Sequence, residues 1–305
     1  KIVDINKCHL QAEPSNQIRN AVRRFAIEIE MPFFDLRAQK GFLRTLLIRN
    51  TLEGEVMVLI QFFEDLKEKI ELLLSFIKDH FPQVTSLLYC INSKGNDSLY
   101  DQEIKCFSGN EYITENLGGL QFRITAKSFY QTNPKQAGEL YTIAKDFAQL
   151  KLQDIVYDLY TGTGTIALTL AHECKKIIGI ESVPDAIKAA NENAKLNGID
   201  NAFFEVGDMR TCFNDIFIKK YGKADVVITD PPRDGMHKDV VAKLLKLAPK
   251  RIVYISCNSA SQARDLELMR KNYKVVKSQA VDMFPQTHHV ENVVLLHSKA
   301  SDELT

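Results

Sequence analysis

The stretch that decides the fold is Asp158-Leu159-Tyr160-Thr161-Gly162-Thr163-Gly164-Thr165. It follows an apolar run, residues 155–160, that is typical of a buried strand, and it precedes another, residues 166–171, that is typical of a helix. A glycine-rich turn between a strand and a helix lets a ligand approach the backbone closely, beside the N–H groups at the helix start. The stretch therefore predicts a cofactor-binding corner, although many such turns contain two glycines for packing alone.

A second short apolar segment, residues 176–181, ends in an acid, Glu181. In doubly wound folds, an acid at the tip of the second strand accepts hydrogen bonds from a ribose. The turn at residues 158–165 lacks the third glycine of the dinucleotide fingerprint, and its wider opening suits a nucleoside that carries an amino acid. The sequence therefore favours S-adenosylmethionine as the cofactor.

The composition limits the class of protein. The 305 residues are 45% hydrophobic, enough for two domains with their own cores, and 39 basic residues balance 39 acidic ones. This balance gives no global signal of nucleic-acid binding but allows a local basic face. No apolar run of about 18 residues is present, so we expect no membrane span. The scattered cysteines contain no C-x-x-C pair, which favours a reducing, cytoplasmic location.

The first part of the chain, residues 1–115, predicts a small α+β domain. Two strand-like runs separated by residues 51–54 predict a hairpin, and an amphipathic helix is expected to lie on it. Residues 110–119 are expected to cross into the second domain. The predicted elements are helices over residues 15–26 and 63–81 and strands over residues 41–50, 55–62 and 84–92.

The second part, residues 116–305, alternates strands and helices at a pitch that predicts a parallel sheet with helices on both faces. Ligands in such α/β sheets bind at the carboxyl ends of the strands. We predict strands over residues 120–124, 155–160, 176–181, 202–206, 224–229, 251–256, 274–282 and 291–297, and helices over residues 135–150, 165–173, 184–197, 237–247 and 260–271.

Polar residues of distinct chemistry follow the predicted parallel strands. Asp208, the turn Asp230-Pro231-Pro232-Arg233 and Cys257 each come after one of them. The two prolines stiffen their turn and hold a carboxylate and a guanidinium at the sheet edge. Asp208 serves equally well as a helix cap. A cysteine at the rim of a cofactor cleft is a candidate nucleophile, whereas most single cysteines fill a core.

In this order the motifs resemble those of the RNA uracil-C5 methyltransferases, the family that makes 5-methyluridine in tRNA and ribosomal RNA. Six motifs spread over residues 128–291 make the match specific, and the first domain matches more loosely. The resemblance implies a Rossmann-like, S-adenosylmethionine-dependent methyltransferase domain preceded by the smaller α+β domain. The matching segments are Ser128-Phe-Tyr-Gln-Thr-Asn133, Asp158 to Thr165, Ile180-Glu181, Asp230 to Arg233, Ser256-Cys257-Asn258 and Phe284-Pro-Gln-Thr-His-His-Val-Glu291.

The resemblance also implies roles for individual residues. Cys257 is expected to be the nucleophile and Glu291 the base. Phe129 is expected to lie against the target uracil. Apart from the resemblance, a cation near O4 of the uracil would stabilise negative charge there, and Arg233 is expected either to supply it or to form a structural ion pair. The implied cofactor contacts are Gln131, Tyr160, Gly162, Gly164, Thr165, Glu181, Asp208 and Asp230.

The residue types suit this chemistry on their own. Uracil C5 is a poor nucleophile, but a thiolate that adds to C6 turns the ring into an enolate whose C5 can attack a sulfonium methyl group. Cys257 supplies such a thiolate. The C5 proton must then be removed so that the cysteine can be eliminated, and the carboxylate of Glu291 fits that step.

The chain departs from the family at its start. Many members carry an OB-like RNA-binding domain and a four-cysteine iron–sulfur cluster, and Cys8 resembles the last cluster cysteine. One cysteine cannot hold a cluster, so we expect none in this chain. The sequence shows no further metal ligands that would converge on the pair His288-His289, so we expect no metal site there. We expect the two histidines to shape the loop that presents Glu291. The sequence shows no signal peptide, and because the chain starts at Lys1 without Met, we expect a fragment or a processed form.

The expected partner is structured RNA, tRNA or ribosomal RNA, with one uridine flipped out of its stack. No obligate protein partner is expected. Two other readings stay open: an RNA cytosine-C5 methyltransferase, which usually has a second cysteine where Arg233 stands, and a non-catalytic RNA-binding module with the same fold. Candidate phosphate contacts in the first domain are Arg19, Arg23, Arg24, Arg37, Lys40, Arg44 and Arg49.

Overall fold

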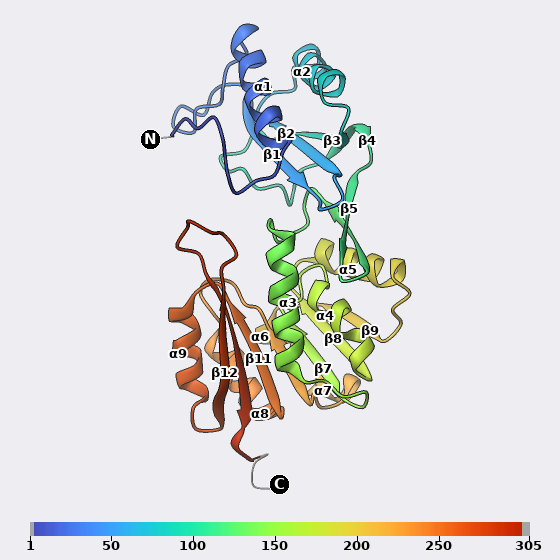
Figure 1. Cartoon of the computed structure of the whole chain (residues 1–305), viewed down its shortest axis with the longest axis vertical. Coiled ribbons are helices and arrows are strands. Elements are labelled where there is room, and N and C mark those ends of the chain that lie inside the picture. Colours follow the sequence, from blue (N-terminus) through green and yellow to red (C-terminus); the bar gives the residue numbers. More distant parts are fainter. Residues whose placement is uncertain (1–2, 301–305) are drawn as a thin grey trace. The chain divides into compact units, whose positions relative to one another are not determined.

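The structure is a computed structural model that describes residues 3–300. The chain divides into two compact units (Figure 1). The first unit extends to Asn116 and includes residues 123–127, and the second comprises residues 117–122 and the chain from Ser128 onward. The predicted boundary between residues 115 and 116 lies beside the first crossing between the units. Within residues 3–300, no helix is long and apolar enough to cross a membrane.

The first unit packs helices on a four-stranded sheet. Its elements are α1 (Ser15–Glu28), β1 (Leu43–Asn50), β2 (Val56–Phe62), α2 (Lys67–His80), β3 (Val84–Ile91) and β4 (Lys105–Gly109). The predicted hairpin is confirmed, because β1 and β2 pair antiparallel. On its other side β2 pairs in parallel with β3, and β3 pairs antiparallel with β4. All seven residues of β2 are buried, as expected of an apolar central strand, and α2 buries the helically spaced residues Ile70, Leu73, Leu74 and Ile77.

Residues 110–119, predicted to be a simple crossing segment, contain a strand. β5 (Tyr112–Leu117) pairs with β6 (Leu120–Thr125) in a separate two-stranded sheet. Gly118 and Gly119 link the strands with φ values of +60° and +84°, a conformation that side chains other than glycine rarely adopt. The two glycines were the sequence signal for this hairpin, because paired residues with positive φ form the tight turns that connect strands.

The second unit is a seven-stranded sheet between layers of helices (Figure 1). Its strands are β7 (Ile155–Leu159), β8 (Lys176–Glu181), β9 (Ala202–Val206), β10 (Val226–Thr229), β11 (Arg251–Ser256), β12 (Tyr273–Val281) and β13 (Glu291–Ser298). Its helices are α3 (Pro134–Ala148), α4 (Thr165–Leu170), α5 (Pro184–Leu196), α6 (Met209–Cys212), α7 (Asp215–Tyr221), α8 (Lys238–Leu247) and α9 (Ser259–Met269), and a 3₁₀ turn covers Ala171–Glu173. α6 and α7 were not predicted.

Two apolar cores confirm that helices cover both faces of this sheet. Alternate residues of one strand enter different cores: in β11, Val253 and Ile255 join the core beneath α3 and α4, whereas Ile252 and Tyr254 join the core beneath α7 and α8. Side chains of successive strand residues point to opposite faces, and both faces here are apolar. The continuous apolar runs in the sequence follow from this double burial.

The strand order is β12-β13-β11-β10-β7-β8-β9. The predicted parallel sheet is confirmed for β11, β10, β7, β8 and β9, whereas β13 runs antiparallel to both β11 and β12. The chain leaves β12, turns through residues 282–290 and returns beside β11. A consequence for the site is that β13 begins, rather than ends, at the edge where the parallel strands have their carboxyl ends.

Candidate active site

The glycine-rich turn after β7 is fixed by its own backbone. Tyr160, Gly162 and Gly164 have positive φ values of +64°, +55° and +79°. The Thr161 N–H donates to the carbonyl of Ile180 at 3.1 Å, which ties the turn to β8. A side-chain carbon at Gly162 would meet no atom within 4 Å, so open space adjoins the turn there. This space leaves room for a ligand beside the backbone, and binding of a cofactor there stays a prediction.

Glu181 stands at the end of β8, beside that turn. Its Oε2 accepts the Gly162 N–H at 3.3 Å. Its Oε1 accepts the N–H groups of Ser182 at 2.7 Å and Val183 at 3.0 Å. The carboxylate is thus held at the mouth of the glycine-rich turn, the position that suits a ribose in doubly wound folds.

Asp158 lies beneath the turn and was quoted in the sequence motif without a role of its own. It is fully buried, and the Thr161 hydroxyl donates to its Oδ2 at 2.5 Å. Burial raises the pKa of Asp158 to about 7, against the lowering effect of the Thr161 hydrogen bond. A buried acid within an apolar strand was the signal that could have singled it out.

The register of β11 and β13 brings Cys257 and Glu291 together. Ser256, the last residue of β11, pairs with Asn292 on the antiparallel β13. Cys257 and Glu291 each lie one residue beyond this last pair, at the carboxyl edge of the parallel strands. Burial raises the pKa of the Cys257 thiol, as do the charges of Glu291 and Asp230, whereas Arg233 lowers it. The two residues predicted as nucleophile and base are neighbours in the structure.

Asp230 follows β10, and its N–H lies 3.4 Å from the Leu159 carbonyl at the end of β7. Burial, followed by the charges of Glu291 and Asp158, raises the pKa of Asp230 well above its usual range. Burial also raises the pKa of Glu291, and Arg233 opposes this. Three carboxyl groups from separate strands therefore converge on one small region, where their ionised forms repel one another.

Tyr141 faces the same carboxyl groups and was missed by the sequence analysis. It lies on α3. Burial raises the pKa of its hydroxyl well above the usual range, and the charge of Asp230 raises it further. The charges of Asp158 and Glu291 contribute as well. In the sequence, Tyr141 sits in the apolar stripe of an amphipathic helix, so nothing distinguished it from an ordinary core residue.

The sequence model of the tRNA (uracil-5-)-methyltransferase family matches residues 48–299. The chain belongs to this family. The matched span contains every predicted site residue from Phe129 to Glu291.

Individual members of the family agree in sequence and structure. A protein of Porphyromonas gingivalis described as an uncharacterised RNA methyltransferase is 54% identical over 300 residues, which cover 97% of this chain and 64% of the relative. A protein of Bacteroides thetaiotaomicron with the same description is 52% identical over 299 residues, which cover 97% and 66%. The chain thus spans slightly less than two thirds of the length of these relatives. The crystal structure of the Pyrococcus abyssi tRNA (uracil-54, C5)-methyltransferase in complex with S-adenosyl-L-homocysteine is 32% identical, with a TM-score of 0.81, and covers 97% of this chain and 70% of that one.

In this family member, Asp208 acts as the helix cap that the sequence offered as an alternative. Its Oδ1 accepts the Arg210 N–H at 2.7 Å at the start of α6, and the Arg210 side chain binds its carboxylate through Nε and Nη2. Hydrogen bonds from the Arg210 side chain lower the pKa of Asp208 to about 2. A cofactor contact by Asp208 stays a prediction.

The family motif at residues 128–133 precedes α3. Phe129 is 70% exposed, while Gln131 is partly buried. Asn133 caps α3 through the Gln136 N–H and donates to the Met283 carbonyl at 2.9 Å, so the motif is tied to the segment that leads into the loop before Glu291. An exposed aromatic ring beside such a motif is free to stack on a base.

The loop before Glu291 carries the two histidines. The rings of His288 and His289 lie 4.1 Å apart, and the charge of His288 lowers the pKa of His289. Among residues 3–300, no group of three or more His, Cys, Asp and Glu side chains is placed to hold a metal ion. Cys8 exchanges backbone hydrogen bonds with the Asn16 side chain.

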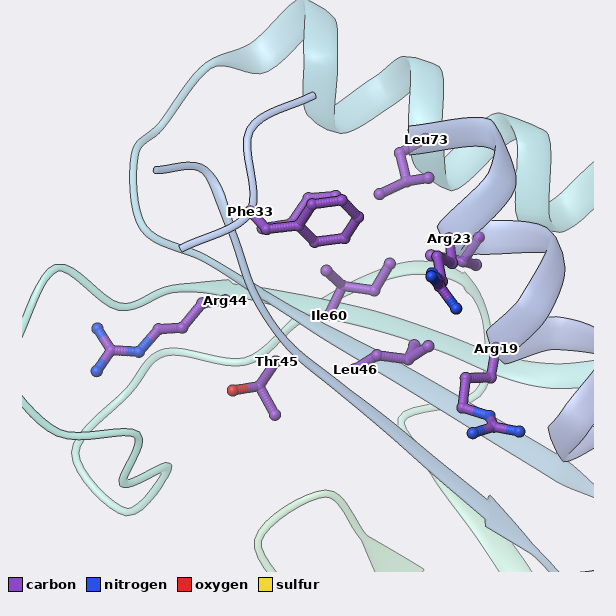
Figure 2. A pocket seen from close by; sticks show the side chains of 10 residues that line it. Arg19, Arg23, Phe33, Arg44, Thr45, Leu46, Ile60 and Leu73 are labelled. Carbon is purple, nitrogen blue, oxygen red and sulfur yellow. The ribbon is translucent and has the colours of Figure 1, made fainter. Parts of the chain in front are cut away.

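The first unit of this family member contains a pocket of about 190 Å³ (Figure 2). The ring of Phe33, which is 53% exposed, lies above Ile60. Arg23 reaches the pocket from α1 and is paired with Asp4. Arg49, one of the predicted phosphate contacts, instead turns inward and donates to two carbonyls of the same unit at 3.4 and 3.5 Å. The pocket is lined by Arg19, Val22, Arg23, Phe33, Leu43, Arg44, Thr45, Leu46, Ile60 and Leu73.

Proposed function

We propose that this chain carries the catalytic part of an S-adenosylmethionine-dependent RNA methyltransferase that forms 5-methyluridine. The observation that carries the proposal is the Ser256–Asn292 pair that ends the β11–β13 ladder, because it brings the adjacent residues Cys257 and Glu291 to the strand edge that also bears the glycine-rich turn. The family supports uracil C5 as the target, and the Pyrococcus abyssi relative, solved with S-adenosyl-L-homocysteine, supports the methyl donor.

The residues at this edge fit the cofactor. Open space adjoins Gly162, and Glu181 is held at the mouth of the turn where it can accept hydrogen bonds from a ribose. When bound, S-adenosylmethionine supplies an electrophilic methyl group on a sulfonium. Gly164 and Thr165 shape the start of α4, and Gln131, Tyr160 and Asp230 are the further proposed contacts, with Asp208 as the least supported of the set.

The proposed reaction follows from the paired side chains. Cys257 adds as a thiolate to C6 of the uracil, and the electrons of the C5–C6 double bond move onto the C4 carbonyl as an enolate. C5 then takes the methyl group, and Glu291 removes the C5 proton so that the C6–S bond breaks and the thiolate is restored. The raised pKa of Glu291 makes it a stronger base at neutral pH, and Arg233 favours the thiolate of Cys257.

The proposed substrate is a uridine flipped out of a structured RNA, because C6 of a stacked base is out of reach of a thiolate. Phe129, exposed beside the catalytic motif, is the proposed stacking partner. In the first unit, the exposed Phe33 ring and the arginines around it are residue types that stack on bases and pair with phosphates. The choice between tRNA and ribosomal RNA rests on RNA shape, so both are included as test substrates.

The test is covalent trapping with RNA that contains 5-fluorouridine. Fluorine at C5 cannot leave as a proton, so the addition mechanism predicts a protein–RNA adduct on a denaturing gel in the presence of S-adenosylmethionine. Cys257→Ala is expected to abolish the adduct. Glu291→Gln is expected to retain it and to lower turnover on ordinary RNA by about 10²–10⁴-fold.

Asp282→Asn is the matched control for Glu291, because Asp282 is an exposed carboxyl next to Val281, which pairs with Glu291. It should leave turnover unchanged. The assay is run on this chain and on the full-length protein, since the relatives are longer. An adduct that persists in Cys257→Ala, or none with full-length protein that binds both cofactor and RNA, would reject the mechanism.

A further inference from the structure

Asp265 lies in the middle of α9 with no exposed surface. Its Oδ2 accepts the Met236 N–H and the Tyr254 hydroxyl, each at 2.7 Å. Its Oδ1 accepts Nε of Arg264 at 3.0 Å and Nη2 at 2.8 Å. A buried carboxylate is costly unless its oxygens are paired in this way, so a residue of this kind needs an explanation beyond core packing.

The explanation lies in the turn that Asp265 contacts. Met236 belongs to the segment that contains Asp230 and Arg233, and Gly235 passes so close to Asp265 that an added side-chain carbon would lie 2.6 Å from Oδ2. Arg264 also donates to the Asp234 carbonyl at 2.7 Å. The turn is thus held by the charged pair inside α9 rather than by a partner in its own strand.

The same helix also holds the turn at a second point. The Arg233 carbonyl accepts the Asn258 side chain at 3.0 Å and the Ser261 hydroxyl at 2.9 Å. Asn258 caps α9 and directly follows Cys257. α9 therefore fixes the backbone of Arg233 and of Cys257 relative to each other.

We propose that Asp265 is a positioning residue, which holds the turn of residues 230–236 so that the backbone of Arg233 stays fixed at the start of α9, beside Cys257. The inference deepens the proposed function, because it rests on Cys257 as the nucleophile there. It assigns a task to a side chain that contacts none of the reacting atoms.

The groups that face Cys257 set the expected effect. Glu291 on β13 and Asp230 after β10 disfavour its thiolate, and Arg233 is the cation that favours it. If the turn loosens, the guanidinium of Arg233 moves away from Cys257, while the carboxyl groups of Glu291 and Asp230 stay near it. The thiol then ionises at higher pH.

The test measures alkylation of each cysteine by iodoacetamide, read by peptide mass spectrometry from about pH 6 to about pH 10, a range that brackets the ordinary cysteine pKa. In Asp265→Ala we expect the Cys257 midpoint to rise by about one pH unit and its alkylation at neutral pH to slow roughly tenfold, since rate follows the thiolate fraction. Asp265→Asn, which can keep an oxygen toward Met236, should show a smaller shift.

A control variant and a reference cysteine distinguish a positioning role of Asp265 from a general effect on stability. Tyr254→Phe removes a hydrogen bond to the same carboxylate without touching the turn, so it should lower the melting temperature and leave the Cys257 profile in place. Exposed Cys106 in the first unit is the internal reference and should not change in any variant.

An unchanged Cys257 midpoint in folded Asp265→Ala overturns the inference. If that variant does not fold, Asp265→Asn and Ser261→Ala decide, because each loosens one hold on the turn, and a midpoint unmoved in both overturns it equally. Alkylation needs neither RNA nor methyl transfer. A shifted midpoint without any 5-fluorouridine adduct would therefore keep the positioning role and reject the proposed reaction.

Discussion

Two neighbouring turns of the second unit are built by different means. The glycine-rich turn after β7 takes its shape from positive φ at Tyr160, Gly162 and Gly164, within five residues of chain. The turn of residues 230–236 after β10 is held by side chains of α9 and its cap, which lie 25 to 30 residues farther along the chain. The first turn is also tied to β8, by the Ile180 carbonyl and the Glu181 side chain, but positive φ values of its own residues set its backbone shape. The second turn depends on side chains of a distant helix. The first turn should therefore respond to changes in its own residues, and the second to changes in α9.

The largest expected effect concerns the buried carboxyl group beneath the glycine-rich turn. Asp158, beneath it, has a pKa of about 7 in the folded protein, against an ordinary value of about 3.9 when unfolded. Between about pH 4 and about pH 7 the folded state therefore binds more protons than the unfolded state, so this group makes the free energy of unfolding fall as pH rises through that window. Above about pH 7 its contribution is constant.

Asp158→Asn removes this pH dependence and keeps an oxygen for the Thr161 hydroxyl. Relative to the parent protein, its free energy of unfolding should be similar near pH 4 and should rise by up to about 4 kcal/mol by pH 7. Urea denaturation across the pH range measures the difference. Asp146→Asn, at an exposed carboxyl on α3, is the control and should follow the parent. Parallel curves for Asp158→Asn and parent would contradict the prediction.

The second expected effect separates the two glycines of the turn. An added side-chain carbon at Gly164 would lie 2.8 Å from the Phe204 ring, whereas at Gly162 it would meet nothing within 4 Å. Gly162→Ala should cost only the strain of a left-handed conformation, about 1 kcal/mol, and Gly164→Ala about 2–3 kcal/mol, because the ring must also move. Thermal unfolding measures both, and Gly164→Ala combined with Phe204→Leu should recover part of the loss. Equal losses at the two positions would show that backbone strain alone governs this turn.

The difference between the turns also explains what the sequence could predict. β8 and β11 have the predicted bounds, because continuous apolar runs and flanking polar residues define a doubly buried strand, and the partly exposed edge strand β9 also has them. The glycine-rich turn and the cap role of Asp208 were likewise visible, since glycine pairs and capping acids act over a few residues. The short helices α6 and α7 were missed because they are too short for an apolar period to emerge.

Features set by long-range pairing escaped prediction. The antiparallel direction of β13 depends on which strand it joins, and a run of apolar residues does not encode that choice. Tyr141 and Asp265 look in sequence like ordinary members of amphipathic helices, and only the fold brings them against the carboxyl groups and the turn. Cys257 was singled out by its place after a predicted strand, whereas Glu291 was identified by resemblance to a family, and no pattern in the sequence placed the two residues side by side.

The smallest expected effect concerns Asp208, where the cap and the predicted cofactor contact compete for one carboxylate. Arg210 occupies that carboxylate at the surface, with side chains 55% and 42% exposed, and solvent screening leaves such exposed pairs with little effect on stability. Arg210→Ala should therefore barely change the melting temperature, since the cap bond uses the backbone N–H. If Asp208 binds the nucleoside, freeing it should tighten S-adenosyl-L-homocysteine binding, measured by calorimetry. Asp208→Asn, which still caps a helix, should weaken that binding without loss of stability. Unchanged affinity in both variants would make Asp208 a cap alone and leave Glu181 as the acid that serves the ribose.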